Sequence, residues 1–436
     1  MFSYYFDLGL RSLRRNAVLT ILLVTAIAVG IGASMTALTV FRAMSGDPIP
    51  RKSAQLFVPQ IDSQGPNGGE TTDDHLEDRL TYIDAMALMK AHAATRQTAL
   101  FAATLSLKPA DPKQKPFRTL VRAVYVDFFA MFDVPFEYGH AWSAAGDDNR
   151  APIVVVTHAL NERVFGGADS VGKTLNLGGE TYTIAGVLDH WEPIPQFYDI
   201  SRTPFAGKDE VFMPFTHAID KQLGALGSTH CEKDEPVGFD ALLRSECTWG
   251  RFWVELPTAA DVAKYRTFLD NYAAEQRRNG RFDWPPRTQL RDVMTWLRYN
   301  HVVPGEVRIL ILVSFGFLLV CLLNAMGLML AKLMGRAADI GVRRALGASR
   351  GAIFAQCLVE TAVVGLAGGL FGLVLTALGL GAARALLPSE FLAVTHLDAA
   401  DILIALILGI GSTIAAGLYP TWRAAHVQPA WQLKAQ

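Results

Sequence analysis

One stretch of the chain matches a motif for nucleotide chemistry. Residues Gly167–Thr174 read GADSVGKT, which fits G-x-x-x-x-G-K-T, the phosphate-binding loop of ATP- and GTP-hydrolysing proteins. That loop needs a strand directly before it and a helix directly after it, so that backbone N–H groups and the helix dipole converge on the phosphates. Here the following segment, TLNLGGETYTIAGVL, alternates polar and apolar residues around Gly178 and Gly179. This pattern predicts a β-hairpin instead of a helix, so we expect no nucleotide site.

Other patterns for catalysis are equally weak. Residues Gly347–Gly351 read GASRG, which fits the nucleophile elbow G-x-S-x-G, but no strand precedes them and no Asp and His partners suggest themselves. No H-E-x-x-H motif and no paired C-x-x-C occur in the sequence. We therefore expect no catalytic residue, no cofactor and no metal site, and a chain that is not an enzyme.

The four cysteines fall into two groups. Cys321 and Cys357 lie in or beside long apolar stretches and are interpreted as small apolar fillers. Cys231 and Cys247 lie in a polar part of the chain that we place outside the cytoplasm, where oxidising conditions favour a disulfide. The alternative is a metal site helped by His230, for which a fourth ligand is not obvious.

Four uncharged stretches are long enough to cross a bilayer, which requires about 20 apolar residues per helix. They are residues 17–41, 309–331, 361–383 and 402–422. Buried helices of a soluble protein are the alternative, but soluble cores rarely hold four such stretches. The first stretch follows three arginines, as a secretory signal would, but it exceeds the about 7–15 apolar residues of a signal and no A-x-A-like cleavage site follows. We expect an uncleaved anchor.

Basic residues beside these stretches predict the orientation, because short cytoplasmic segments carry an excess of Lys and Arg. The cytoplasmic side should hold the N-terminal segment 1–16, the segment 332–360 and the tail 423–436, which carry Arg11, Arg14, Arg15, Lys332, Arg336, Arg343, Arg344, Arg350, Arg423 and Lys434. The short loop 384–401 has the opposite balance, with Arg384 against Glu390, Asp398 and Asp401. We expect both termini in the cytoplasm and residues 42–308 outside it.

Residues 42–308 have mixed charge and frequent turns, typical of a globular domain. We expect a membrane protein with four transmembrane α-helices and a large extracytoplasmic α+β domain inserted between helices 1 and 2. Each end of this domain predicts a strand, a helix and a strand, which suggests a subdomain built from both ends with a β-rich insertion between them. The predicted elements are 54–60, 80–93 and 98–107, then 251–256, 257–277 and 281–284.

The segment between the second and third membrane helices holds the strongest local signal. Apolar residues recur four apart, and charged residues occupy the other faces, which predicts a short amphipathic helix at about 334–346. Gly347 would end it and Ser349 could cap the next helix. One hypothesis is that this helix lies on anionic lipid headgroups. The other, which we favour, is that it docks a cytoplasmic partner.

A resemblance to a known family supports the second hypothesis. Residues Asp339–Leu375, DIGVRRALGASRGAIFAQCLVETAVVGLAGGLFGLVL, resemble the hallmark segment of FtsX/MacB-type ABC transporter permeases. LGLRSLRRNAVLTILLVTAIAVGIGASM resembles the start of that family, and AAGLYPTWRAAHVQPAWQLK resembles its ending. The stretches VDFFAMFDVPFEYGHAW and APIVVVTHALNERVFGGADSVGKTLNLGGETYTIAGVLD resemble its periplasmic core domain.

The resemblance implies a multi-pass protein of the bacterial inner membrane that pairs with a second permease, identical or paralogous. Each permease would bind a cytoplasmic ABC ATPase, whose ATP-driven closure moves the spans and the periplasmic domains (mechanotransmission) for export or extraction of a substrate. The printed sequence shows no fused ATPase domain, so we expect the ATPase on a separate chain. A periplasmic adaptor, an outer-membrane channel and membrane lipid complete the expected partners, and the net charge of −1 gives no case for nucleic acid.

Two sets of residues receive roles from these arguments. The expected ATPase-coupling residues are Arg336, Asp339, Arg343, Arg344 and Leu346. The third membrane helix carries overlapping G-x-x-x-G spacings that let helices approach closely, either within the chain or between two permeases: Gly365, Gly368, Gly369 and Gly372. A second functional hypothesis is a membrane-anchored regulator that activates a periplasmic enzyme.

Overall fold

The computed structural model describes residues 17–63, 65, 76–111, 113–200, 204–205, 208–231, 236–386 and 399–425. These residues belong to two compact units, one from Met1–Ser45 and Val303–Gln436 and the other from Gly46–Val302. The first contains the helices of membrane-spanning length, and the second is a large α/β domain inserted between the first and second of them. The predicted fold class is confirmed. The predicted segment 1–16 and most of the predicted segments 384–401 and 423–436 lie outside the described residues.

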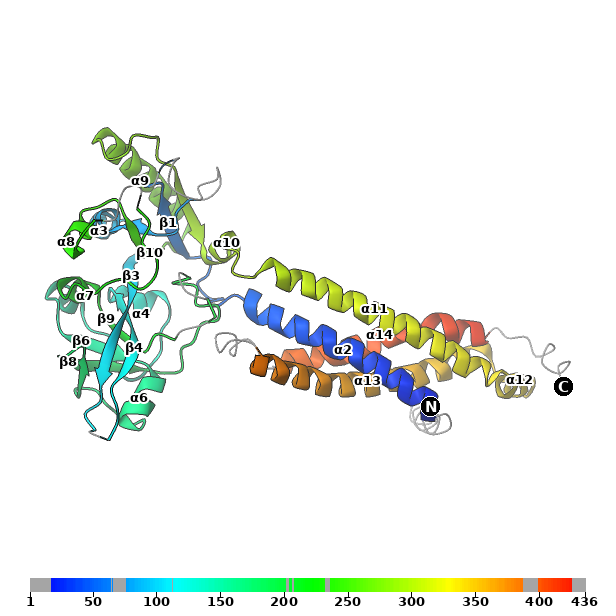
Figure 1. Cartoon of the computed structure of the whole chain (residues 1–436). Helices are drawn as coiled ribbons and strands as arrows, with labels where there is room; N and C mark the ends of the chain where they lie inside the picture. The colour runs from blue at the N-terminus through cyan, green and yellow to red at the C-terminus, as the bar shows by residue number, and fades with distance from the viewer. Residues whose placement is uncertain are drawn as a thin grey trace. The chain divides into compact units, whose positions relative to one another are not determined.

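Four helices in the first unit are long and apolar enough to cross a membrane: α2 (Ala17–Ser45), α11 (Gly305–Met334), α13 (Arg350–Leu386) and α14 (Ala399–Ala425). A short helix, α12 (Ala337–Ala345), connects α11 to α13. Each long helix extends beyond the uncharged stretch that predicts it, because helical hydrogen bonding continues into flanking polar residues. Figure 1 shows the four long helices lying side by side, and α13 packs against both α2 and α14.

The core of the bundle is apolar and draws on all four long helices. Ile27 of α2, Leu318 of α11, Val364 of α13 and Ala405 of α14 are buried together in one cluster. The other faces of these helices carry exposed Leu, Ile, Val and Phe side chains, as lipid-facing surfaces do.

The second unit is built on one mixed sheet of eleven strands. The strands are β1 (Leu56–Ile61), β2 (Leu80–Thr81), β3 (Arg96–Lys108), β4 (Phe117–Val124), β5 (Phe136–Gly139), β6 (Ile153–Val156), β7 (Thr174–Leu177), β8 (Glu180–Leu188), β9 (Val211–Pro214), β10 (Thr248–Glu255) and β11 (Thr288–Asp292). Their order is β11-β1-β10-β3-β4-β9-β6-β8-β5, with β2 beside β10 and β7 beside β3 and β8. Most neighbours are antiparallel, but β4–β9 and β6–β8 are parallel.

The domain also contains helices, several of which bury apolar side chains against this sheet. They are α3 (Tyr82–Ala91), α4 (Asp127–Met131), α5 (Ala144–Asp148), α6 (His158–Phe165), α7 (Phe215–Asp220), α8 (Phe239–Leu243), α9 (Ala259–Arg278) and α10 (Val293–Tyr299). Leu88 of α3 and Leu269 of α9 lie in one buried cluster with Phe101 of β3 and Val254 of β10. The pairing of β1 with β11 joins the two ends of the domain, and α10 follows β11 before the chain continues to α11.

One predicted strand is wrong. Residues 281–284 are irregular, and the strand of that region is β11, which begins at Thr288. The cause is tertiary, since the Arg281 side chain turns into a cluster with Asp84 and Glu246. The helix predicted from residue 257 begins at Ala259, because Thr258 and Asp261 form a capping box at its N-terminus.

Candidate functional site

The helix α12 is delimited by the residues that the sequence indicates. Gly335 follows the end of α11, and Gly347 adopts a positive φ of 98° after the end of α12. The Ser349 hydroxyl accepts a hydrogen bond from the Ala352 N–H at 3.2 Å, which caps the start of α13. The GASRG stretch is therefore a turn between two helices, without the strand that a nucleophile elbow requires.

One face of α12 packs on the bundle and the other is exposed. Ile340 packs against the buried core of the bundle, as does Ala348 just beyond the helix. On the outer side Val342 is 60% exposed and Leu346 83% exposed, with exposed Arg343 beside them. Such a surface, both apolar and basic, suits docking to a protein or to anionic headgroups.

The expected coupling residues do not all belong to this exposed surface. Arg343 is exposed, Arg344 is half-buried, and Leu346 is 83% exposed. Arg336, the N-cap residue of α12, instead turns inward and donates from Nη1 to both carboxylate oxygens of Glu360 at 3.2 and 3.3 Å. Asp339 lies within α12, but its side chain lies outside the described residues.

Glu360 of α13 lies at the centre of an ionic cluster that also involves α11, the N-cap of α12 and, through Lys332, α2. Its carboxylate on α13 lies 2.8 Å from Nζ of Lys332 on α11, and the Lys332 side chain is only 4% exposed. The Lys332 ammonium also lies 3.4 Å from the Thr20 hydroxyl of α2. With Arg336 at the N-cap of α12, this ionic cluster connects the short helix to the spans. Its partners are far apart in sequence, so the sequence alone did not identify it.

A second polar contact fixes α12 to α13. Nη1 of Arg343 donates to Oε1 of Gln356 at 3.1 Å. Gln356 and Glu360 are four residues apart on α13 and therefore lie on the same face of that helix. Both ends of α12 are thus bound to one face of α13.

The four glycines of α13 make close contacts inside the chain, on two faces. A Cβ added at Gly368 or Gly372 would lie 2.6 or 2.8 Å from Cγ2 of an isoleucine of α2, Ile27 or Ile31 respectively. A Cβ added at Gly365 would lie 2.8 Å from a backbone oxygen of α14, and Gly369 faces the same helix. The structure thus uses these glycines for intrachain packing of α13 between α2 and α14.

In the second unit, Cys231 and Cys247 form a disulfide. The neighbouring residue His230 pairs with Thr248 through an isolated β-bridge, so the bridge closes a loop beside the start of β10. Among the described residues, no group of three or more His, Cys, Asp or Glu side chains is placed to hold a metal ion.

The GADSVGKT stretch has the hairpin context that the alternation predicts. It follows α6, Gly166 ends that helix with a φ of 69°, and Thr174 begins β7, which pairs with β8 across Gly178 and Gly179. The structure describes all of residues 166–200, and the elements that follow the motif there are the strands β7 and β8. Lys173 lies 5.4 Å from the centroid of the Phe165 ring. The geometry of a phosphate-binding loop is not present here.

Four helices long and apolar enough to span a membrane, with an α/β domain inserted between the first and the second, define a multi-pass membrane protein. A family model described as the MacB-like periplasmic core domain matches residues 20–269, and one described as the FtsX-like permease C-terminal matches residues 311–429. The chain therefore belongs to the MacB/FtsX family of ABC transporter permeases.

Curated relatives carry the name of this family. The macrolide export ATP-binding/permease protein MacB of Rhodospirillum rubrum is 24% identical over 446 residues, and that of Escherichia coli K12 is 22% identical over 437 residues. Each alignment covers 98% of this chain and 59% or 60% of the relative, so the chain spans about three fifths of the length of these curated relatives. The crystal structure of the periplasmic region of MacB from Actinobacillus actinomycetemcomitans is similar, with 14% identity, 59% of this chain and 97% of that chain covered, and a TM-score of 0.38. The extracellular domain of the ABC-type transporter YknZ from Gram-positive bacteria gives 10% identity, 53% and 99% coverage, and a TM-score of 0.34.

Proposed function

We propose that this chain is the transmembrane subunit that couples a separate cytoplasmic ATPase to conformational change in its extracytoplasmic domain, for export or extraction of a substrate. In this proposal the chain itself is non-catalytic, and both termini and α12 lie in the cytoplasm. A second permease, identical or paralogous, completes the complex, and a periplasmic adaptor and an outer-membrane channel can join it. Macrolide export, the activity in the names of the relatives, is one form of this proposal.

The exposed surface of α12 is the observation that carries the proposal. Val342 and Leu346 expose apolar surface beside a cationic residue, Arg343, at the connection between two spans. A helix that docks an ATPase needs such a surface and also needs a firm attachment to the spans, because a loosely held helix would move without moving them. The contacts of Arg336 with Glu360 and of Arg343 with Gln356 supply that attachment.

The same contacts divide the expected coupling residues into two roles. We assign Arg344, Leu346 and Val342 to the contact with the ATPase. The exposed Arg343 contributes to both roles, because it also donates to Gln356. We assign Arg336 to the attachment of α12, because its guanidinium binds Glu360 inside the bundle.

Charge reversal on α12 tests the proposal. The double variant Arg343→Glu and Arg344→Glu should reduce co-purification of the ATPase in mild detergent at least about tenfold, since it reverses the charge of the docking surface, and a partner complementary to a cationic surface would then meet like charges that cost several kcal/mol. The matched control is Arg277→Glu with Arg278→Glu, which reverses two exposed adjacent arginines on α9 of the extracytoplasmic domain. Unchanged co-purification and unchanged transport in the α12 variant would overturn the assignment.

The regulator hypothesis predicts a different result from the same preparation. A complex that hydrolyses ATP and stimulates a periplasmic hydrolase, but moves no substrate, would replace transport by signalling as the function of this chain. The role of α12 in coupling would stand in both cases.

A further inference from the structure

The last helix of the extracytoplasmic domain, α10, directly precedes span α11 in the sequence. α10 ends at Tyr299, and α11 begins at Gly305. Along the chain, α10 is therefore the element of the domain nearest to α11. Within the domain α10 is well anchored, since Trp296 is buried and its ring lies edge-on to that of Trp253 with 6.5 Å between the centroids.

The side chain at the end of α10 holds a segment that has no sheet partner of its own. The Tyr299 hydroxyl accepts a hydrogen bond from the Leu76 N–H and donates one to the Leu76 carbonyl oxygen at 3.0 Å. Leu76 begins the relay segment, by which we mean residues Leu76–Arg79, just before β2. One tyrosine thus satisfies both backbone groups of the residue that starts this segment.

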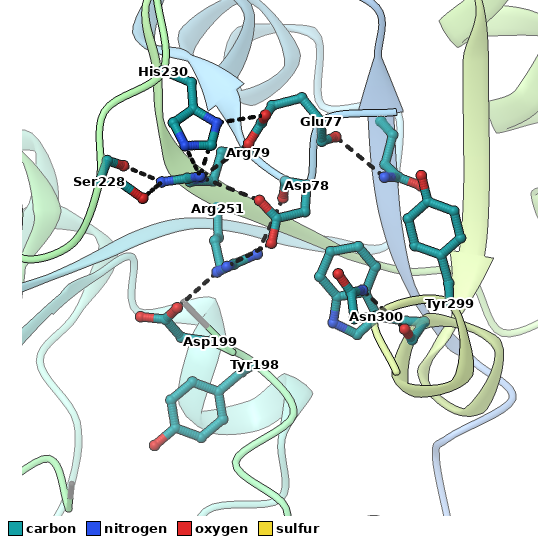
Figure 2. Close-up of polar contacts among 12 residues, drawn as sticks. Glu77, Asp78, Arg79, Tyr198, Asp199, Ser228, His230, Arg251, Tyr299 and Asn300 are labelled. Atoms are coloured by element: carbon teal, nitrogen blue, oxygen red, sulfur yellow. Dashed lines mark hydrogen bonds and ion pairs between the residues drawn. The ribbon is translucent and has the colours of Figure 1, made fainter. Parts of the chain in front are cut away.

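The middle of the relay segment is bound to a buried arginine of β10. Nη2 of Arg251 lies 2.8 Å from Oδ2 of Asp78, and its Nη1 donates to the Asp78 carbonyl oxygen at 3.2 Å. On its other side Nε of Arg251 lies 2.7 Å from Oδ1 of Asp199, as Figure 2 shows. The Arg251 side chain is 4% exposed, so these charges are shielded from water.

The end of the relay segment reaches the disulfide. Nε of Arg79 donates to Glu77 and Asp78 at 3.1 Å each, while its Nη1 donates to the Ser228 hydroxyl at 3.2 Å. Nη2 of Arg79 lies 3.3 Å from the ring nitrogens of His230, and Nδ1 of His230 lies 2.9 Å from Glu77 (Figure 2).

Electrostatic attraction holds Asp78 of the relay segment to two arginines, Arg251 and Arg79. Burial works to raise the pKa of Asp78, but the positive charges of Arg251 and Arg79 outweigh it and hold that pKa below its ordinary value. Separating the two members of a buried ion pair is strongly destabilising, so we expect Asp78 and Arg251 to move together. The backbone of His230 in turn exchanges two hydrogen bonds with Thr248, beside the Cys231–Cys247 disulfide.

We propose that the relay segment transmits displacement of α10 to the disulfide loop at Ser228–Cys231, with Tyr299 and Asp78 as the positioning residues of the ATP-driven change in the domain. This inference rests on the proposed function, because ATP must first move the spans. It identifies which part of the domain responds and which side chains make it respond.

Hydrogen exchange on the intact complex tests the relay. The full chain is purified with the ATPase that accompanies it, and amide exchange is compared without nucleotide and with ATP plus orthovanadate. We expect exchange at residues 76–79 and 228–231 to change by about fivefold in the wild-type chain, the factor expected when a local hydrogen bond is made or lost. Tyr299→Phe should abolish this response, and Asp78→Asn should do the same.

A second tyrosine provides the matched control. The Tyr272 hydroxyl donates to Asp84 at 2.7 Å, in a second buried cluster that also contains Arg281 and Glu246. Tyr272→Phe should therefore keep the nucleotide response. A merely structural role of Tyr299 would raise exchange without nucleotide and leave the response to nucleotide in place.

The outcomes separate the relay from the proposed function. A response at residues 336–348 with none at 228–231 in the wild-type chain would overturn the relay, as would a full response in both Tyr299→Phe and Asp78→Asn. If residues 336–348 fail to respond in the wild-type complex, the proposed function fails and the relay with it. Loss confined to the two relay variants, with Tyr272→Phe unaffected, supports the relay.

Discussion

Replacing Glu360 with Gln should separate the movement of α12 from that of the spans. The change keeps the size of the side chain and removes its charge, leaving the Lys332 ammonium, whose side chain is 4% exposed, without its carboxylate partner. Removing one partner of a buried ion pair costs about 3–5 kcal/mol. Arg336 loses the same carboxylate and keeps at most a neutral hydrogen bond to position 360, so the attachment of the α12 N-cap to α13 is weakened.

The assay needs two measurements on the same preparation. For a unit of this size, about 3 kcal/mol corresponds to a fall of about 6–12 °C in the unfolding midpoint, measured with the complex in lipid nanodiscs. Substrate-stimulated ATPase activity should fall as well, while ATPase binding persists because the exposed surface of α12 is unchanged. Gln356→Ala gives the comparison, since it removes the weaker attachment of α12, a single exposed hydrogen bond to Arg343 worth about 1 kcal/mol or less, and should lower the midpoint and the coupling by less than Glu360→Gln does.

A double variant isolates the coupling role from stability. Lys332→Met together with Glu360→Gln removes both charges of the pair, which should cost less stability than removing one partner and leaving the other charge buried. The double variant should regain part of the unfolding midpoint and still couple poorly, because Arg336 then faces a neutral amide at position 360 instead of the carboxylate. Wild-type coupling in this double variant would refute the idea that Glu360 links α12 to the spans.

Three further predictions follow from single contacts. Gly368→Val should lower stability by about 1–3 kcal/mol by overpacking against α2, whereas Gly381→Ala, on the same helix with open space around it, should be neutral or slightly stabilising; thermal unfolding compares them. Replacing Cys231 and Cys247 with Ser should cost about 3 kcal/mol and make the unfolding midpoint insensitive to reductant. Burial raises the pKa of Asp147 from 3.8 to about 6, so the folded state binds this proton more tightly than the unfolded state. The free energy of unfolding is therefore highest below about pH 4 and falls by up to about 3 kcal/mol as pH rises through about 6. Asp147→Asn should flatten this pH dependence in denaturant unfolding.

Features that depend on local pattern were predicted well from the sequence. The spans follow from uninterrupted apolar length, and the hairpin after GADSVGKT follows from alternation around two glycines. In contrast, β11 escaped prediction because TQLRD is mostly polar and only Leu290 is buried. The RFDW segment has strand-like residues, but Phe282 packs into the core from an irregular segment.

The polar contacts at the candidate site could not be read from local pattern, because their members are brought together only by the fold. Glu360 and Lys332 lie on different helices, and Asp78 and Arg251 come from opposite ends of the domain. Nothing in the spacing of such residues indicates a pair. The only local signal is a charge at the margin of an apolar stretch, which indicates that a partner must exist without naming it.

The bundle carries ionic contacts near both ends and close glycine packing between them, and this arrangement bears on how it can move. Arg42 at the end of α2 pairs with Asp401 at the start of α14, a carboxylate that is 4% exposed. At the end that carries α12, Glu360 binds Lys332, and between the two ends α13 is packed backbone-close against α2 and α14. Sliding of one helix past another would break a buried pair and drive Cβ atoms into the positions of glycines. Tilting of the bundle as a whole disturbs neither, so we infer that a displacement of α12 reaches α2 and α11 as a rigid-body movement.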